Sequence, residues 1–476
     1  MREEGEVEST YCITLADGTI FTRSLSRDTY RRSLVTNIVN SAAGTPVETL
    51  FYSYDALNRP ISRNADTFGY NDRSEVSSAN ISGFSNAYGY DEIGNLLLSA
   101  QNIVTNLYIA NNLNQYTSIL RNSVSPCEPS YDADGNLLSD CVFTFTYDAA
   151  NRLKTISSNG VLLVTNFYDA KSRRVRKVTP EAATTFFYDD WNLIEERIAY
   201  TNGATSTIHY YWGKDLSGTL QGAGGVGGLL YLAVNDSVYI PFYDNNGNIT
   251  RYLDSTGETV ATYTYDAFGN TISQSGSLAN IFRHRFSTKY IDSETDLYYY
   301  GYRFYHPILM RWLTRDPIEE SGGVNLYGVC GNNPVSRYDK DGRAYFALRP
   351  LSGMPWLWLA SHNIIDDLFN TEIAHEHLFF EDGKEPSNFG LHNNVDDEGS
   401  QIFHNENPSK YKHFERGYDD CVMRIAVENV KPKRYSLLGS FRVSKYNCQD
   451  YCSDLRREYF RLILINSIRK KCCLRK

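Results

Sequence analysis

The chain has 476 residues, too many for one ordinary hydrophobic core, so we expect at least two structural units. Charged residues make up 22%, and no run of about 18 apolar residues occurs, which excludes a transmembrane helix. The net charge of −9 argues against a nucleic-acid surface along the whole chain. The acidic start at Met1 has no apolar stretch behind it, so it does not resemble a secretory signal, and export requires other machinery.

Cysteine and histidine are concentrated near the end of the chain, whereas tyrosine is concentrated before residue 343. The 37 tyrosines outnumber the 23 phenylalanines and 5 tryptophans together, which is typical of many strands with one polar edge. The cysteine count of 9 is odd, and the front region is long enough to fold without crosslinks, so a disulfide framework is a poor explanation. Side chains capable of nucleophilic, acid–base or metal chemistry are therefore concentrated in residues 343–476.

One short phrase, Tyr-Asp followed by turn residues, recurs along the front of the chain. Its copies begin at Tyr54, Tyr90, Tyr131, Tyr147, Tyr168, Tyr188, Tyr243 and Tyr265. Most spacings are close to one or two units of about 20 residues, which indicates a repeat array. In each copy a strand meets an aspartate that can bond backbone amides, and several copies continue into Gly-Asn, which tolerates positive φ. We therefore predict strand–turn–strand modules, with alternating strands at residues 143–147 and 260–265.

These phrases resemble the Rhs/YD-repeat family, whose members wind such hairpins into a β shell. The resemblance covers about residues 45–342 and implies a mainly β fold, a β-spiral or cocoon of stacked hairpins. The glycine-rich stretch at residues 211–229 lacks the strand-to-helix context of a phosphate loop, so we expect a turn inside the sheet. Because the array begins almost at Met1, we expect the chain to be the tail of a longer ancestor or one piece of it.

Residues 282–342 resemble the Rhs-associated core of the same family. The resemblance is carried by Tyr290-Ile-Asp-Ser-Glu-Thr-Asp-Leu, by Arg311-Trp-Leu-Thr-Arg-Asp-Pro and by the closing Asp339-Lys-Asp-Gly. It implies an intramolecular aspartyl-type protease that severs the chain near its end. Such chemistry requires a carboxylate that activates water and another group that protonates the carbonyl or the leaving amine.

By this resemblance, Asp316 is the candidate carboxylate, Arg315 tunes its charge, and Asp292 is a second candidate. The cut is expected between Gly342 and Arg343. Two positions depart from the family pattern, because Asp296 replaces a usual glycine and Arg343 replaces a usual leucine or methionine. A structural alternative makes Asp316 the cap of a turn before Pro317.

Beyond Gly342 the phrase stops, and the resemblance implies an interchangeable effector domain. Within it, strands are expected near residues 375–383, 402–405 and 435–441, and helices at about residues 419–429 and 447–469. Asn447 would cap the second helix, which places Cys448 in its first turn. The positive end of a helix stabilises a thiolate, so Cys448 is a candidate nucleophile.

A nucleophilic cysteine also requires an imidazole, and His375 or His377 precedes it on an expected strand. Asn388 or His392 would orient that imidazole. This order resembles the permuted papain-like fold of NlpC-like and lecithin retinol acyltransferase-like enzymes. It implies a small α+β cysteine hydrolase or acyltransferase that needs no cofactor.

Three alternatives stay open for the effector. A tetrahedral zinc site would use His375, His377, Cys448 and Cys452. A nuclease is the second alternative, suggested by the basic tail from Arg469 onward. In the third, the repeats form a cell-surface or carbohydrate-binding scaffold and the tail is inactive.

The sequence thus predicts a repeat array at residues 1–281, a core segment at 282–342 and an effector at 343–476. This organisation indicates a secreted or delivered bacterial polymorphic toxin whose shell encloses the effector until cleavage. The implied partners are an immunity protein, a delivery apparatus, and a target-cell protein, peptide or lipid substrate. Surface carbohydrate is the partner in the scaffold alternative.

Overall fold

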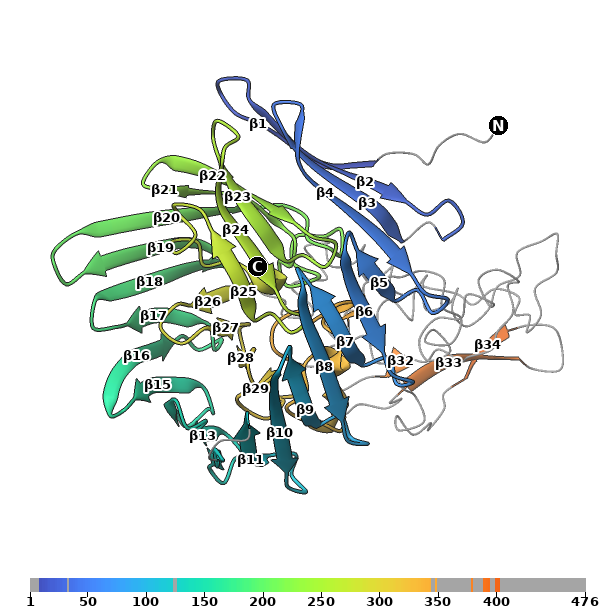
Figure 1. Ribbon diagram of the computed structural model, residues 1–476, viewed down its shortest axis with the longest axis vertical. Helices are drawn as coiled ribbons and strands as arrows, with labels where there is room; N and C mark the ends of the chain where they lie inside the picture. Colours follow the sequence, from blue (N-terminus) through green and yellow to red (C-terminus); the bar gives the residue numbers. More distant parts are fainter. Residues whose placement is uncertain are drawn as a thin grey trace. The chain divides into compact units, whose positions relative to one another are not determined.

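The computed structural model describes residues 8–31, 34–122 and 126–343, together with short strands at 347–348, 378–379, 388–393 and 399–402. The chain divides into two compact units, Met1–Ser352 and Gly353–Lys476. The first unit is almost entirely β and contains two large antiparallel sheets (Figure 1). This confirms the predicted mainly β class. Among the helices that the described residues form, none has the length and hydropathy needed to cross a membrane.

The first sheet has eleven strands, each paired with its neighbours in the chain. They are β1 (Glu8–Thr14), β2 (Ile20–Arg27), β3 (Val35–Ala42), β4 (Thr45–Tyr54), β5 (Pro60–Arg63), β6 (Asp66–Tyr70), β7 (Val76–Ile81), β8 (Phe84–Tyr90), β9 (Leu96–Gln101), β10 (Val104–Ala110) and β11 (Tyr116–Arg121). Hairpins therefore begin well before the first Tyr-Asp copy at Tyr54. The phrase does not show this, because the early turns use other residues.

The second sheet has fourteen strands in the same sequential order. They are β12 (Ser130–Tyr131), β13 (Leu137–Ser139), β14 (Thr144–Tyr147), β15 (Leu153–Ser158), β16 (Val161–Tyr168), β17 (Arg174–Val178), β18 (Ala182–Asp189), β19 (Asn192–Tyr200), β20 (Thr205–Trp212), β21 (Leu229–Val234), β22 (Ser237–Tyr243), β23 (Ile249–Asp254), β24 (Thr259–Tyr265) and β25 (Thr271–Ser275). The strands expected near residues 143–147 and 260–265 are confirmed as β14 and β24. The glycine-rich stretch forms the connection between β20 and β21, as expected.

Most of the Tyr-Asp copies form a turn in which one aspartate satisfies several donors, whereas Asp189 of the Tyr188 copy is the last residue of β18. At Asp91, Oδ1 accepts hydrogen bonds from the amides of Ile93 and Asn95 at 3.0 and 2.8 Å, and Oδ2 accepts from Asn95 Nδ2 at 2.8 Å. Equivalent bonds occur at Asp55, Asp148, Asp169, Asp244 and Asp266. The fourth turn residue has positive φ, +88° at Gly94, +60° at Asn58 and +65° at Ser172, which explains why glycine or asparagine stands there in most copies.

The tyrosine of each copy connects its repeat to the preceding one. The hydroxyl of Tyr168 donates to the carbonyl oxygen of Leu153 at 2.6 Å, and that of Tyr188 donates to the carbonyl of Arg174 at 2.9 Å. The same bond joins Tyr54 to Val35, Tyr90 to Val76, Tyr147 to Leu137 and Tyr265 to Ile249. Phenylalanine cannot donate this bond, so the repeat requires tyrosine and the chain is rich in it.

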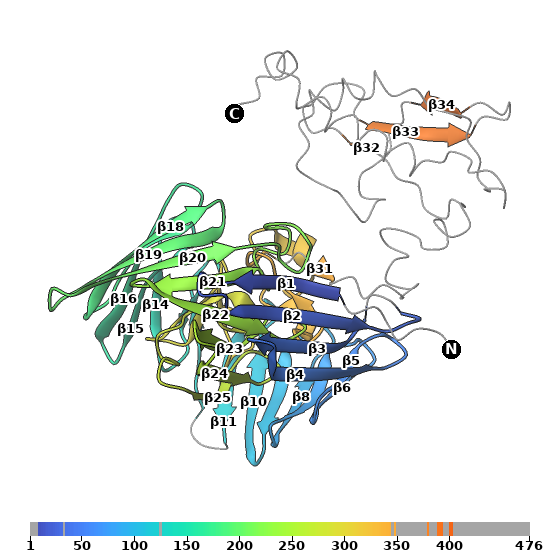
Figure 2. The ribbon, with the colours of Figure 1, turned by 90° about the horizontal axis from the view of Figure 1, so that it is seen from above.

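The end of the first unit packs between the sheets (Figures 1 and 2). It contains β26 (Tyr290–Asp292), β27 (Leu297–Tyr299), β28 (Phe304–His306) and β29 (Arg311–Trp312), with β30 (Arg337–Tyr338) paired to β31 (Ala347–Leu348). Three 3-10 helices accompany them: η1 (Phe286–Thr288), η2 (Glu319–Gly322) and η3 (Cys330–Asn332). Side chains from this segment and from strands of both sheets form one continuous hydrophobic core.

The core segment, residues 282–342, docks on the repeat turns through a recurring contact. In six turns the carbonyl oxygen of the fourth residue accepts a hydrogen bond from a core-segment side chain, at 2.7 to 3.1 Å. The pairs, acceptor first, are Ser74 with Asn333, Gly94 with Asn332, Asn114 with Arg311, Gly135 with Tyr327, Gly247 with Thr288 and Gly269 with Tyr298. The left-handed backbone at these residues therefore allows their carbonyl groups to accept hydrogen bonds from the core segment.

The first strands of one sheet also meet the last strands of the other. Tyr11 on β1 donates to the carbonyl oxygen of Pro241 on β22 at 3.0 Å. Arg23 on β2 donates to the carbonyl oxygen of Asp244 at 3.1 Å. Phe21 and Phe242 belong to one small apolar cluster at the same place. The two sheets therefore contact each other directly as well as through the core segment.

A disulfide joins Cys127 to Cys141, with Cα atoms 5.8 Å apart, while Cys12 and Cys330 are free. Our sequence interpretation did not anticipate this bond, because cysteine spacing in a repeat array does not show which loops the sheets bring together.

The second unit is described at β32 (Leu378–Phe379), β33 (Asn388–Asn393) and β34 (Gly399–Ile402), which form a three-stranded sheet. β32 falls inside the strand expected at residues 375–383. The strand expected near residues 435–441 and the two expected helices lie outside the described residues.

Substituting Gly247 tests the inward-facing turns. A Cβ at Gly247 would lie 2.6 Å from Val226 Cγ1 and 3.0 Å from the Gly227 amide nitrogen. Gly160 has nearly the same φ, +78° against +77°, but nothing within 4 Å of its Cβ position. We expect Gly247→Ala to lower the free energy of unfolding by about 1–3 kcal/mol more than Gly160→Ala does, as measured by urea denaturation. Equal losses would contradict close docking at this turn.

Candidate functional site

The core segment brings together two of the residues that the sequence associated with self-cleavage. Asp316 follows β29 and is 4% exposed. Its Oδ1 accepts from the amide of Ile318 at 2.9 Å, and its Oδ2 pairs with Nη2 of Arg303 at 2.9 Å. Arg303, which is 1% exposed, also donates through Nε to the carbonyl oxygen of Gly342. One guanidinium therefore contacts both the candidate carboxylate and the carbonyl of the expected scissile bond.

Arg303 was not among the residues that we selected from the sequence, yet it holds the centre of the site. Its remaining donor, Nη1, bonds the carbonyl oxygen of Leu326 at 3.1 Å, and its guanidinium lies 4.4 Å from the ring centre of Trp312. These contacts fix the planar group in one orientation. A guanidinium in this position can polarise a carbonyl and stabilise the negative charge that develops when water adds to it.

A second carboxyl group, Asp339, lies next to the same arginine. Its Oδ2 is 4.0 Å from Arg303 Nη2, and its Oδ1 accepts from the amides of Asp341 and Gly342 at 3.0 and 2.7 Å. Burial raises the pKa of Asp339 to about 7. The group is thus able to carry a proton near neutral pH, as a general acid must.

Lys289 and Gly224, which belongs to the glycine-rich stretch at residues 211–229, contact the backbone that leads into the expected cut. Lys289 Nζ donates to the carbonyl oxygens of Lys340 at 2.6 Å and of Gly224 at 2.9 Å. A Cβ at Gly224 would lie 1.9 Å from the Lys340 carbonyl oxygen, so only glycine permits this approach. Burial lowers the pKa of Lys289 to about 8. The segment before Gly342 is therefore clamped on a second side.

The two departures from the family pattern have physical explanations. Asp296 has a φ of +57°, in the region that favours glycine and that aspartate tolerates. Arg343 pairs with Asp341 across the expected cut, with Nη2 2.6 Å from Oδ2, and lies 4.3 Å from the ring centre of Tyr302.

The other two predicted residues of the core segment have different surroundings. Arg315 lies against the turn at Gly135, where a Cβ would come within 2.3 Å of its Nε. Asp292 is fully buried and pairs with Arg174 at 2.6 Å and Lys177 at 3.1 Å, both on β17. Burial opposes ionisation of Asp292, but these two cations more than compensate and lower its pKa below the usual value. These contacts favour a structural role for Asp292, which links the core segment to the second sheet.

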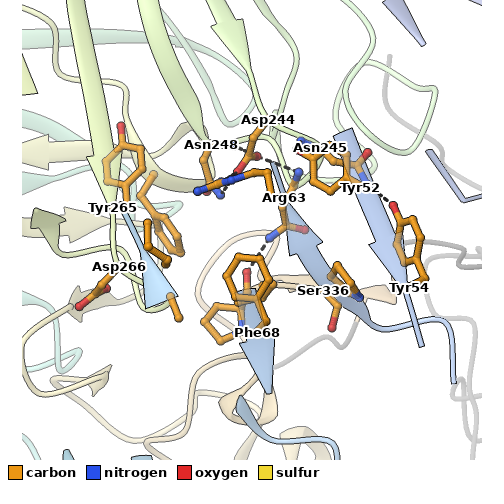
Figure 3. A pocket seen from close by; sticks show the side chains of 17 residues that line it. Tyr52, Tyr54, Arg63, Phe68, Asp244, Asn245, Asn248, Tyr265, Asp266 and Ser336 are labelled. Carbon is orange, nitrogen blue, oxygen red and sulfur yellow. Dashed lines mark hydrogen bonds and ion pairs between the residues drawn. The ribbon is translucent and has the colours of Figure 1, made fainter. Parts of the chain in front are cut away.

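A separate pocket lies where β4–β6 face the turn between β22 and β23 (Figure 3). Arg63 crosses the gap and pairs with Asp244 at 2.8 Å, while the Asn245 amide donates to the Tyr52 hydroxyl at 2.9 Å. Burial raises the pKa of Asp266, which also lines the pocket, to about 6. The cavity measures about 40 Å³. At roughly 10–15 Å³ per water it holds a few waters and no organic substrate.

The predicted effector residues cannot be placed as a site. His375, His377, Cys448 and Cys452 lie outside the described residues. Asn388 and His392 lie on β33, where the backbone pairs them with Phe379 of β32 and Ser400 of β34. Within the part of the chain that the structure describes, no three His, Cys, Asp or Glu side chains form a group that could hold a metal ion.

Comparison with known proteins identifies a family for the first unit. The family model described as Teneurin YD-shell matches residues 9–335. The tRNA nuclease WapA of Bacillus subtilis (strain 168) is 32% identical over 258 residues, which are 52% of this chain and 10% of that protein. Toxin subunit YenC1 of Yersinia entomophaga is 28% identical over 290 residues, which are 54% of this chain and 29% of that protein. The chain thus spans well under half the length of these relatives.

A solved structure has the same fold. The crystal structure of TcdB2-TccC3 without its hypervariable C-terminal region aligns with a TM-score of 0.56 at 18% identity. The alignment covers 70% of this chain and 19% of that one. It confirms the hairpin shell that the Tyr-Asp phrase predicted.

The raised pKa of Asp339 makes a prediction about stability. A carboxyl whose folded pKa lies above its unfolded value stabilises the fold at pH below about 4, and this contribution is lost as pH rises towards 7. Asp339→Asn keeps the Oδ1 acceptor and carries no charge. We expect the free energy of unfolding of this variant to rise relative to the wild type by up to about 1.4 kcal/mol per pH unit between pH 4 and 7. A difference independent of pH would contradict the shifted pKa.

Proposed function

This chain belongs to the Teneurin YD-shell family, and from that membership we propose that it is part of a bacterial polymorphic toxin that severs itself near Gly342. Residues 343–476 would be its effector, carried by the shell until the cut. The observation that supports self-cleavage best is the contact of one buried guanidinium, Arg303, with both the Asp316 carboxylate and the Gly342 carbonyl. A residue that only capped a turn would not require this arrangement.

In the proposed reaction, the Asp316 carboxylate removes a proton from a water molecule, whose oxygen attacks the Gly342 carbonyl carbon. Arg303 stabilises the oxyanion that forms. Asp339 in its protonated form then gives a proton to the nitrogen of Arg343 as the carbon–nitrogen bond breaks. The products are a carboxylate on Gly342 and an amine on Arg343, and water supplies the atoms that they gain. A carboxylate paired with a buried guanidinium, next to a second carboxyl group whose pKa burial raises to about 7, suits this chemistry.

For the effector we propose cysteine chemistry, in which His375 or His377 deprotonates Cys448 and Asn388 or His392 orients the imidazole. The thiolate would attack an amide or ester carbonyl of a target-cell protein, peptide or lipid. This proposal rests on the position of Cys448 in the first turn of an expected helix. A nuclease is the second candidate, because the Bacillus relative is named as a tRNA nuclease.

The proposed partners follow from the same membership. Relatives that are toxin subunits support delivery by a companion apparatus into a target cell. A producer of such an effector also requires an immunity protein that blocks it. The zinc site of His375, His377, Cys448 and Cys452 stays an alternative for the effector, and so does a carbohydrate-binding scaffold with an inactive tail.

Intact mass of the purified chain tests self-cleavage. We expect the wild type to yield two fragments that separate near Gly342, while Asp316→Asn and Arg303→Gln keep one full-length species. Asp134→Asn, at an exposed turn position, is the matched control and should cleave like the wild type. The wild-type rate should fall as pH rises through about 7, because Asp339 then loses its proton. A wild type that stays intact from pH 5 to 8 would refute the proposal.

Growth of bacteria that express the full chain tests the effector. We expect growth arrest, and Cys448→Ala should abolish it if the thiol is the nucleophile. Cys452→Ala should keep the arrest in that case, whereas loss of both arrest and bound zinc in this variant would favour the metal site. Loss of intact tRNA that persists in Cys448→Ala would favour the nuclease. Normal growth with a folded, soluble chain would favour the scaffold.

A further inference from the structure

The disulfide lies at the place where the chain passes from one sheet to the other. β11 is the last strand of the first sheet and β12 is the first strand of the second. Cys127 lies between them and exchanges two backbone hydrogen bonds with Ile119 of β11, at 2.7 and 2.8 Å. Cys141 lies in the turn between β13 and β14. The bond therefore joins the segment that pairs with the last strand of one sheet to the turn between β13 and β14 of the other.

The backbone of Cys141 has an unusual conformation for a cysteine. Its φ is +71°, in the left-handed region, where asparagine is the commonest of the other non-glycine residues that the structure describes. Cysteine has no turn preference that offsets the cost of this conformation. Formation of the disulfide does, because a crosslink restricts the unfolded chain. A cysteine in this turn is thus consistent with the crosslink, although free Cys330, with a φ of +50°, shows that the conformation alone does not require one.

The same turn is anchored on the core segment by a separate contact. Asp140 Oδ2 lies 2.9 Å from His306 Nε2 on β28, and both side chains are buried. Asp140 Oδ1 accepts from the amides of Val142 and Phe143 at 2.9 and 2.6 Å. Loss of the disulfide would therefore leave the turn in place and release only the connection to β11. The change would be confined to the junction of the two sheets.

The two sulfurs differ in access. Cys127 is 8% exposed, whereas Cys141 is an exposed residue at the tip of its turn. A reductant can therefore approach the bond from the side of Cys141. Free Cys12, which is exposed on β1, provides an internal comparison for thiol accessibility.

We propose that Cys127–Cys141 is a redox-sensitive latch on the junction between the sheets, formed in an oxidising medium and opened by dithiol reductants. A thiolate of the reductant attacks one sulfur, the sulfur–sulfur bond breaks and a mixed disulfide forms. The second thiol of the reductant then displaces the remaining cysteine. Two electrons and two protons pass from the dithiol to the cysteine pair, and the reductant leaves as its cyclic disulfide. A chain that moves from an oxidising medium into a reducing cytosol would lose this crosslink on arrival.

Thiol mapping and amide exchange on the full chain test the latch. The protein is oxidised in air, divided, and treated or not treated with dithiothreitol before alkylation and peptide mass analysis. We expect Cys127 and Cys141 to be alkylated only after reduction, and Cys12 in both samples. Amide exchange at Ile119 and Cys127 should become about 100-fold faster on reduction, because a loop of this length loses its crosslink. Amides of β2 and β3 should not change.

Two variants separate the latch from a general loss of stability. Cys127→Ser combined with Cys141→Ser should show the fast exchange at Ile119 with or without dithiothreitol. Cys12→Ser should respond as the wild type does. Alkylation of Cys127 and Cys141 in the oxidised wild type would overturn the proposal. So would reduction that leaves exchange at Ile119 unchanged.

Discussion

The first unit depends on one constraint. In the repeat turns that face the core segment, the backbone carbonyl of the fourth residue must find a hydrogen-bond donor. The aspartate of each turn satisfies the local amides, and the left-handed fourth residue bonds inward in six turns. Because a buried carbonyl without a donor is costly, the array and the core segment depend on each other. The repeat supplies acceptors at regular intervals, and the core segment supplies matching donors from residues that follow no repeat.

This constraint explains a difference between copies of the phrase that is visible in the sequence. Copies with glycine in fourth position pack closely on other parts of the unit, on the core segment at Gly94, Gly135 and Gly269 and on the glycine-rich stretch at Gly247. Asn58 and Asn151 instead accept side-chain bonds from other parts of the array. The turns, the strands and the sheet order were predictable because they depend on residues a few positions apart. The positions of the individual hairpins before Tyr54 and the Cys127–Cys141 bond were not, since these hairpins use other turn residues and the disulfide joins distant loops.

The candidate site also contains some residues that a short motif identifies and others that only the folded structure brings to light. Asp316 and Gly342 could be selected from short motifs, but Arg303 lies in a tyrosine-rich segment just before β28 and was not selected. Its role arises because β28 is folded against the closing segment, which brings residues 13 and 39 positions away to one guanidinium. The importance of Asp339 likewise depends on burial, which a motif does not show. Asp292 is the opposite case. The sequence made it a candidate catalytic carboxylate, but in the structure it forms ion pairs with two cations from β17.

The contact between Arg343 and Asp341 has a consequence for the order of events. These side chains stand on opposite sides of the expected cut and form an ion pair, with Tyr302 covering the arginine. Hydrolysis of the peptide between them would remove the covalent connection and leave this clasp intact. In the proposed reaction the two fragments would then stay in contact through an ion pair that contributes only about 0.2–1 kcal/mol, because the Arg343 side chain is 39% exposed. Salt would weaken this contact further, since it screens exposed ion pairs, so separation of the fragments should become faster as ionic strength rises.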